Sequence, residues 1–127
     1  MTQRELLIDF TDLSRRLQGD RDLICQALQA VAEDLPRCTE EMVQNIAVQN
    51  HDSLFRNCHR LKNHAALISC APLLDALETF KKTWNGEDGE KIKTQLDKLR
   101  LFQTEVVSEI EMLRCQIMAT SSLSQIR

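Results

Sequence analysis

One histidine, His59, stands in a residue pattern that fits an exposed nucleophile. Between His51 and Ile68, the apolar residues follow one another at intervals of four, three, four and three: Leu54, Cys58, Leu61, Ala65 and Ile68. This spacing predicts one buried stripe of an α-helix. At about 100° per residue, His59 lies roughly 140° from the centre of that stripe, so we expect its ring in water. Lys62 follows one turn later, within side-chain reach. An imidazole beside an ammonium group on a rigid helix can hold a phosphoryl group.

The neighbours of His59 on this helix suggest a docking surface. Arg56 and Asn63 share its exposed side, and Phe55 and Ala66 flank it at the border between core and solvent. Apolar area around a polar centre is typical of a protein-binding patch, although Phe55 could equally pack at the edge of the core. The segment carries three basic residues against one acidic residue, in a chain with 19 acidic and 16 basic side chains. Such a locally basic face fits an acidic partner, or is simply a solvated helix face.

Other uses of these histidines and cysteines are less consistent with the spacing. A tetrahedral metal site needs converging ligands, and by helical phase Cys58, His59 and His64 point in different directions. Cys58 and His59 are adjacent, so a catalytic dyad is not expected. We expect His64 to lie on the flank of the helix or to contact a neighbouring helix, and His51 to lie in the turn before the histidine helix.

Composition indicates one all-α domain. The chain has 127 residues, three glycines, two prolines and a net charge of −3, which favours neither nucleic acid nor an anionic membrane as a partner. Its five cysteines form no CxxC pair, and no apolar run is long enough for a signal peptide or a membrane span. We therefore expect a cytoplasmic protein with reduced thiols.

Helical periodicity and helix-ending residues divide the chain into segments. Residues 1–8 are expected to be an extension, 9–118 a helical bundle and 119–127 a flexible tail. We expect Thr11 to cap a short helix ending at Leu17, and Gly19 to adopt a left-handed turn. Asp20 should cap a long helix reaching residue 50, bent or split at Pro36.

Three further helices complete the expected bundle. Asp52 should cap the histidine helix, which ends near residues 69–70, and Pro72 fits the first turn of the next helix, which ends near Trp84. Residues 85–89 read as a loop, and a long helix follows. Four amphipathic helices with short connections predict an antiparallel up-and-down four-helix bundle with a short extra N-terminal helix.

The sequence around the histidine resembles a known family. His59-Arg60-Leu61-Lys62 is similar to the His-x-Leu-Lys core of histidine-containing phosphotransfer (HPt) domains, the intermediates of bacterial phosphorelays. The wider pattern is also similar, from about residue 10 to residue 115. It includes Gly19-Asp20 before a long helix, Asp52 before the histidine helix, Leu73, and the pair Leu77-Glu78.

Several positions depart from the family pattern. Asn63 stands where the family usually has glycine, and His64 where it has a small residue; Ala66 and Ser69 replace two further common glycines. The glutamine that orients the histidine ring in many members aligns with Lys81, which cannot accept a proton. Glu78, one turn earlier, could accept the Nδ1 proton instead.

The resemblance implies a phosphorelay intermediate. His59 would carry the phosphoryl group between aspartates of response-regulator receiver domains, Lys62 would stabilise it, and Lys81 would contact the ring or the phosphoryl group. The protein would be a phosphocarrier rather than an enzyme, partnered by receivers or a hybrid sensor histidine kinase. It would need no cofactor of its own, because the Mg²⁺ is expected on the receiver. Two alternatives remain open: an HPt-like adaptor that binds without carrying phosphate, and an unrelated helical interaction module.

Overall fold

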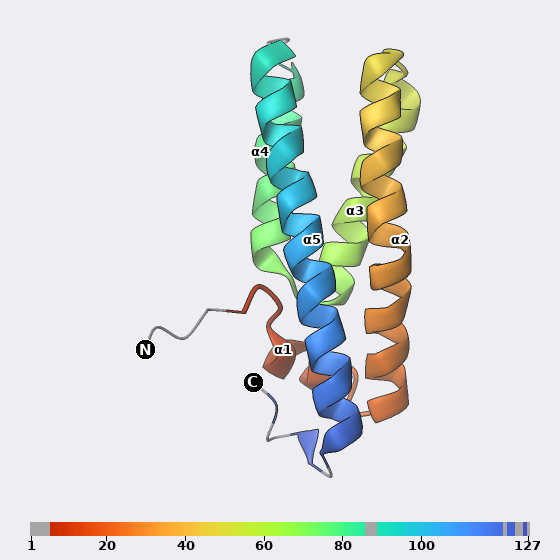
Figure 1. Ribbon diagram of the computed structural model, residues 1–127, viewed down its shortest axis with the longest axis vertical. Helices are drawn as coiled ribbons and strands as arrows, with labels where there is room; N and C mark the ends of the chain where they lie inside the picture. Colours follow the sequence, from red (N-terminus) through yellow and green to blue (C-terminus); the bar gives the residue numbers. More distant parts are fainter. Residues whose placement is uncertain (1–5, 86–88, 121, 124–125, 127) are drawn as a thin grey trace.

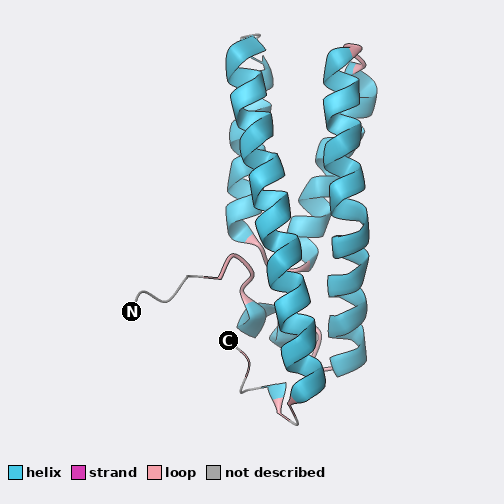
Figure 2. Cartoon of the chain, viewed as in Figure 1, coloured by secondary structure: helices cyan, strands magenta, loops and turns pink. Residues whose placement is uncertain are grey.

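The protein is all-helical throughout the residues that its computed structural model describes, which are 6–85, 89–120, 122–123 and 126 (Figures 1 and 2). The helices are α1 (Phe10–Arg16), α2 (Arg21–Ala47), α3 (His51–Leu67), α4 (Ala71–Asn85) and α5 (Gly89–Ala119). The predicted all-α class is therefore confirmed. A loop was expected at residues 85–89, and its three middle residues, 86–88, lie outside the described range.

The four longer helices pack around a continuous apolar core. α2 packs against α5 and α3, and α4 packs against the same two helices. α1 lies at one end, beside the lower halves of α2 and α5 in Figure 1. Every helix contributes fully buried or nearly buried apolar side chains, such as Leu13, Leu35, Leu61, Phe80 and Leu113. No helix in the described part of the chain combines the length and apolarity needed to cross a membrane.

Side-chain caps set where the helices begin. Asp20 accepts hydrogen bonds from the backbone N–H groups of residues 22 and 23 at the start of α2, as predicted. The other two predicted caps are wrong by two residues each. Asp9 rather than Thr11 caps α1, and Asn50 rather than Asp52 caps α3 through the N–H of Ser53. In both cases the residue that caps the helix lies two positions before the predicted one and is an equally good capping type. A local sequence pattern therefore does not decide between the two candidates.

Left-handed residues follow α1, α2 and α3. Gly19 has a φ of 67°, as its position after α1 predicts, and this conformation suits a residue without a Cβ. Gln18, Gln49 and Ser69 also have positive φ values between 56° and 57°. Gln49 and Ser69 occupy the turns before α3 and after it, so both ends of the histidine helix are defined by tight turns.

Pro36 does not divide α2, which runs unbroken for 27 residues. Of the two effects expected at Pro36, a bend or a split, the split is therefore wrong. The hydroxyl of Thr39 lies within hydrogen-bond distance of two backbone carbonyls beside the proline, that of Leu35 at 3.3 Å and that of Pro36 at 3.1 Å. Leu28, Val31 and Met42 on both sides of Pro36 are fully buried in one core. This shared packing stabilises the helix more than one missing backbone hydrogen bond destabilises it.

The core extends past both expected boundaries of the bundle. Ile8 is buried, and the backbone N–H groups of Leu7 and Ile8 donate to the carboxylate of Glu109 on α5 at 2.9–3.1 Å. At the other end, Leu123 packs against the core and Ile126 is buried. Residues 1–5, 121, 124–125 and 127 lie outside the described range. The polar composition of the C-terminal tail concealed its anchoring residues, and a run as short as Leu6-Leu7-Ile8 gives no periodicity from which burial could be predicted.

Candidate functional site

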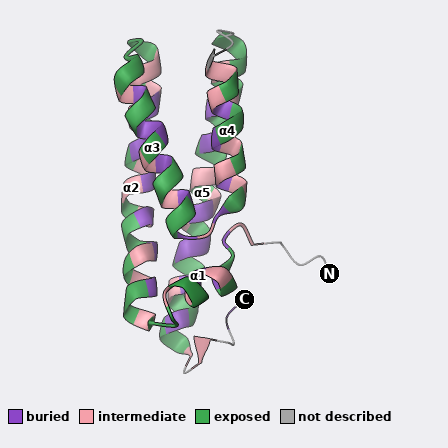
Figure 3. Cartoon of the chain, turned by 180° about the vertical axis from the view of Figure 1, so that it is seen from behind, coloured by how far each residue is buried: buried purple, intermediate pink, exposed green. Residues whose placement is uncertain are grey.

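His59 lies near the middle of α3 with its side chain exposed, as predicted. On the opposite side of the helix, Leu54, Cys58, Leu61 and Ala65 are buried in the core. Figure 3 shows this alternation of buried and exposed residues along α3, on the face turned away from the viewer in Figure 1. The amphipathic pattern alone therefore determined which way this imidazole faces.

Phe55 forms an exposed apolar contact with His59. The two rings meet edge to face, with centroids 4.9 Å apart and planes at 77°. Phe55 is 59% exposed, which excludes the alternative that it packs at the edge of the core. An exposed phenyl ring that supports an exposed imidazole supplies apolar area at the centre of this surface.

The other predicted members of this surface are exposed on the same arc of α3. Arg56, Lys62, Asn63 and Ala66 are all exposed, and with Phe55 and His59 they span an arc of roughly 120°. We call these six residues the His59 face. Within the described part of the chain, neither Arg56 nor Lys62 forms an ion pair, so both cations are available to a ligand.

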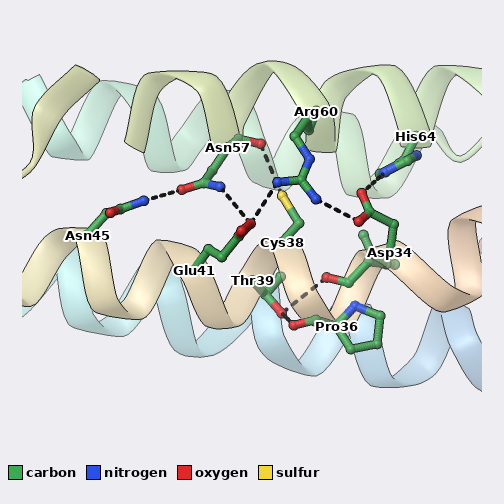
Figure 4. Close-up of polar contacts among 10 residues, drawn as sticks. Asp34, Pro36, Cys38, Thr39, Glu41, Asn45, Asn57, Arg60 and His64 are labelled. Carbon is green, nitrogen blue, oxygen red and sulfur yellow. Dashed lines mark hydrogen bonds and ion pairs between the residues drawn. The ribbon is translucent and has the colours of Figure 1, made fainter. Parts of the chain in front are cut away.

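Arg60 does not belong to the His59 face. Its guanidinium reaches α2 and pairs with Asp34 at 2.6 Å and with Glu41 at 2.7 Å (Figure 4). Two acidic groups of α2 thus neutralise one of the three cations that gave the segment its basic balance. Of the three cations of this segment, Arg56 and Lys62 are the two without an acidic partner among the described residues.

A polar cluster between α2 and α3 fixes the rotation of the histidine helix (Figure 4). Asp34 bridges Arg60 and His64, with 2.6 Å between its second oxygen and His64 Nε2. The hydrogen bond from Arg60 holds the pKa of the Asp34 carboxyl below its ordinary value. His64 is therefore a helix-contact residue, as predicted, and His59 keeps the outer face.

The same cluster continues toward the start of α3. Asn57 is 4% exposed; its amide donates to Glu41 and accepts a 2.6 Å hydrogen bond from Asn45. Sequence periodicity did not identify these polar contacts. Asp34 and Glu41, seven residues apart on one face of α2, were the available signal, because an acidic pair at that spacing can face a basic residue on a neighbouring helix.

α1 secures the other end of α3. Arg16 donates to the carbonyls of Ala66 and Leu67, both at 2.8 Å, and to the hydroxyl of Ser69 at 2.7 Å. The Ala66 carbonyl also accepts from the backbone N–H of Ser69 at 3.2 Å in the turn that follows the helix. Carbonyls in the last turn of a helix lack the regular intrahelical donors, so an arginine is a favourable cap. The sequence predicted a short N-terminal helix but not this contact.

The α4 residues proposed for the site do not reach the His59 ring. Glu78 is exposed, and its carboxylate lies 3.9 Å from Lys81 Nζ. Within the described residues, no hydrogen bond links either side chain to His59. Lys81 instead lines a cavity with Phe55 and Cys58. A role for Glu78 as acceptor of the ring proton stays a prediction for the phosphorylated or partner-bound protein.

His51 does not lie in the turn before α3, as was expected, because it is the first residue of the helix. Its ring meets Trp84 of α4 edge to face at 5.0 Å between centroids. The helix is capped by Asn50, two residues before the predicted cap, Asp52. His51 is therefore part of the helix.

The cysteines are free thiols with no sign of a shared site. Burial raises the pKa of Cys38, Cys58 and Cys70 to about 11, so these thiols are neutral near pH 7. Among the described residues, no group of three or more histidine, cysteine or acidic side chains is placed to hold a metal ion.

Comparisons with known protein families, with curated proteins and with solved structures found no significant match to this chain. The functional interpretation therefore rests on the residues of the site themselves.

Proposed function

We propose that this protein is a phosphorelay intermediate that carries a phosphoryl group on His59. The observation that carries the proposal is an exposed imidazole at the centre of the His59 face, with the unpaired ammonium of Lys62 one turn away. Nε2 of the neutral ring attacks the phosphorus of a receiver aspartyl phosphate. The N–P bond forms as the P–O bond breaks, and the aspartate carboxylate leaves. Transfer to a second receiver reverses these events.

The rest of the His59 face suits a receiver as partner. Lys62 offers charge-assisted hydrogen bonds to the phosphoryl oxygens, and Arg56 adds a second cation toward an acidic surface. Phe55 and Ala66 supply apolar contact area beside the reacting ring. Mg²⁺ belongs to the receiver in this scheme, so the chain itself contributes only the nucleophile and the positive charge.

The proposal extends to the arrangement of the helices. The packing of α2 and α4 against both α3 and α5 supports an antiparallel up-and-down four-helix bundle with α1 at one end. A cytoplasmic location, with a receiver or a hybrid sensor histidine kinase as partner, follows from the same proposal. Free thiols on all five cysteines are compatible with that compartment.

Phosphoryl uptake from a phosphorylated receiver tests the assignment. We expect the unmodified protein to acquire an acid-labile, base-stable label, and His59→Gln to lose it while keeping its helical circular dichroism. His51→Gln is the matched control, because His51 is also an exposed histidine of α3 but is not one of the six residues of the His59 face, and its ring contacts Trp84 of α4. Equal labelling of His59→Gln and the unmodified protein would refute the assignment.

One observation favours an adaptor as a second candidate. Asn63 occupies the His59 face where the resemblance calls for glycine, and its side chain narrows the approach of a partner backbone. An HPt-like adaptor would bind receivers or a kinase through this surface and never become labelled. Binding to several receivers without labelling by any of them would favour the adaptor. The third possibility, an unrelated helical module, predicted a buried or ion-paired His59, and the ring is exposed.

A further inference from the structure

A cavity of about 270 Å³ opens between the first half of α3 and the second half of α4, beside the His59 face. Its buried wall is apolar and consists of Leu54, Cys58 and Phe80. Three aromatic or heteroaromatic rings belong to its rim: His51, Phe55 and Trp84. Because Phe80 and Trp84 also stack with centroids 6.4 Å apart, the cavity presents aromatic surface from the wall to the rim.

Lys81 is the one lysine or arginine among the residues that line this cavity, and it supplies a positive charge there. Its side chain is 32% exposed, and the 3.9 Å contact with Glu78 is too long for a hydrogen bond. Glu78 itself is largely in water, so this contact stabilises the ammonium weakly. A half-buried ammonium against an apolar wall favours an anion that can accept its hydrogen bonds.

The acidic lining residue limits the charge of the ligand. Asp52 lines the same cavity as Lys81 and repels any anion, a dianion about twice as strongly as a monoanion, so a single carboxylate held at Lys81 is favoured. A volume of about 270 Å³ lies just below the usual range for sites of drug-sized molecules, so we expect a smaller ligand, of roughly ten heavy atoms. Aromatic walls, one cation and this size together define a narrow class of ligand.

We propose that this cavity binds a small aromatic monocarboxylate, with its ring against Phe80 and Trp84 and its carboxylate at Lys81 Nζ. The proposal concerns binding alone and does not depend on phosphotransfer. Because Phe55 belongs both to the cavity rim and to the His59 face, a bound ligand would also alter the surface on which a receiver docks. That last consequence, unlike binding itself, rests on the proposed function.

The single tryptophan of the chain, Trp84, reports on occupancy directly. We titrate the full chain with 3-phenylpropionate and follow its emission, using an excitation wavelength at which the ligand does not absorb. We expect a saturable change with a dissociation constant of about 1 mM, as is usual for a ligand of this size. The uncharged 3-phenylpropanamide should bind about tenfold more weakly, because it lacks the charge-assisted hydrogen bond.

Two variants separate the proposed contact from a general effect of charge. Lys81→Met should weaken binding of the acid about tenfold and abolish the difference between acid and amide. Lys82→Met removes a neighbouring, exposed ammonium of α4 that does not line the cavity, and should leave both affinities unchanged. The proposal is overturned if the acid gives no saturable change, if acid and amide bind the unmodified protein equally, or if Lys82→Met weakens binding as much as Lys81→Met.

Discussion

Replacement of Asp34 by asparagine tests whether the polar cluster between α2 and α3 stabilises the fold. Asp34 accepts one hydrogen bond from Arg60 and contacts His64 Nε2 with its other oxygen, both at 2.6 Å. An amide has only one oxygen, so Asp34→Asn must direct its NH₂ group toward one of these two partners. If that partner is Arg60, a donor faces a donor, and in either orientation both contacts lose the negative charge of the carboxylate.

The magnitude follows from the burial of these groups. The side chains of Asp34, Arg60 and His64 are 24%, 38% and 19% exposed, so solvent screens the interactions in part. Arg60 also keeps its second partner, Glu41. We expect Asp34→Asn to lower the free energy of unfolding by about 1.5 kcal/mol at pH 7, which is more than a typical surface substitution costs.

Chemical denaturation followed by circular dichroism measures this change, and its pH dependence identifies the cause. The folded-state pKa of Asp34 lies below its ordinary value of 3.8, with the hydrogen bond from Arg60 as the largest contribution. The stabilisation is therefore complete well above pH 4 and is lost as the pH falls through the folded-state pKa. The gap between the unmodified protein and Asp34→Asn should narrow accordingly below pH 4.

Glu33→Gln is the control for this prediction. Glu33 is the preceding residue of α2, is exposed and contacts only Gln29 on its own helix among the described residues. Its replacement should change stability by less than about 0.5 kcal/mol. Equal stability of Asp34→Asn and the unmodified protein at pH 7, or equal losses for the two variants, would refute the reasoning.

Two further predictions concern the His59 face and the N-terminal segment. Lys62→Ala should slow phosphotransfer or shorten the lifetime of the phosphohistidine about tenfold, because one charge-assisted contact to the phosphoryl oxygens is lost; unchanged kinetics in both directions would exclude Lys62 from the site. Glu109→Gln should speed hydrogen exchange at the amides of residues 7–8, which donate to that carboxylate, and cost about 1 kcal/mol of stability. Glu111→Gln, on an exposed position of the same helix, should do neither.

The sequence determined the helical class and the direction in which His59 faces, because both depend on local periodicity. Apolar residues at intervals of three and four positions define a buried stripe whatever helices cover it, so the opposite face must meet water. The left-handed turn at Gly19 and the cap at Asp20 were predictable for the same reason, since they depend only on a few adjacent residues.

Only the tertiary structure decided which polar residues face each other across helices. That Arg60 is neutralised by Asp34 and Glu41, while Arg56 and Lys62 stay available, depends on the rotation and register of α2 against α3. The continuity of α2 through Pro36 likewise depends on core packing on both sides of it, and the burial of Ile8 and Ile126 on where the chain ends meet the bundle. The cavity at Lys81 forms between two helices, so neither helix alone specifies it. Periodicity describes one helix at a time, whereas charge pairing and cavities arise between helices, where it carries no information.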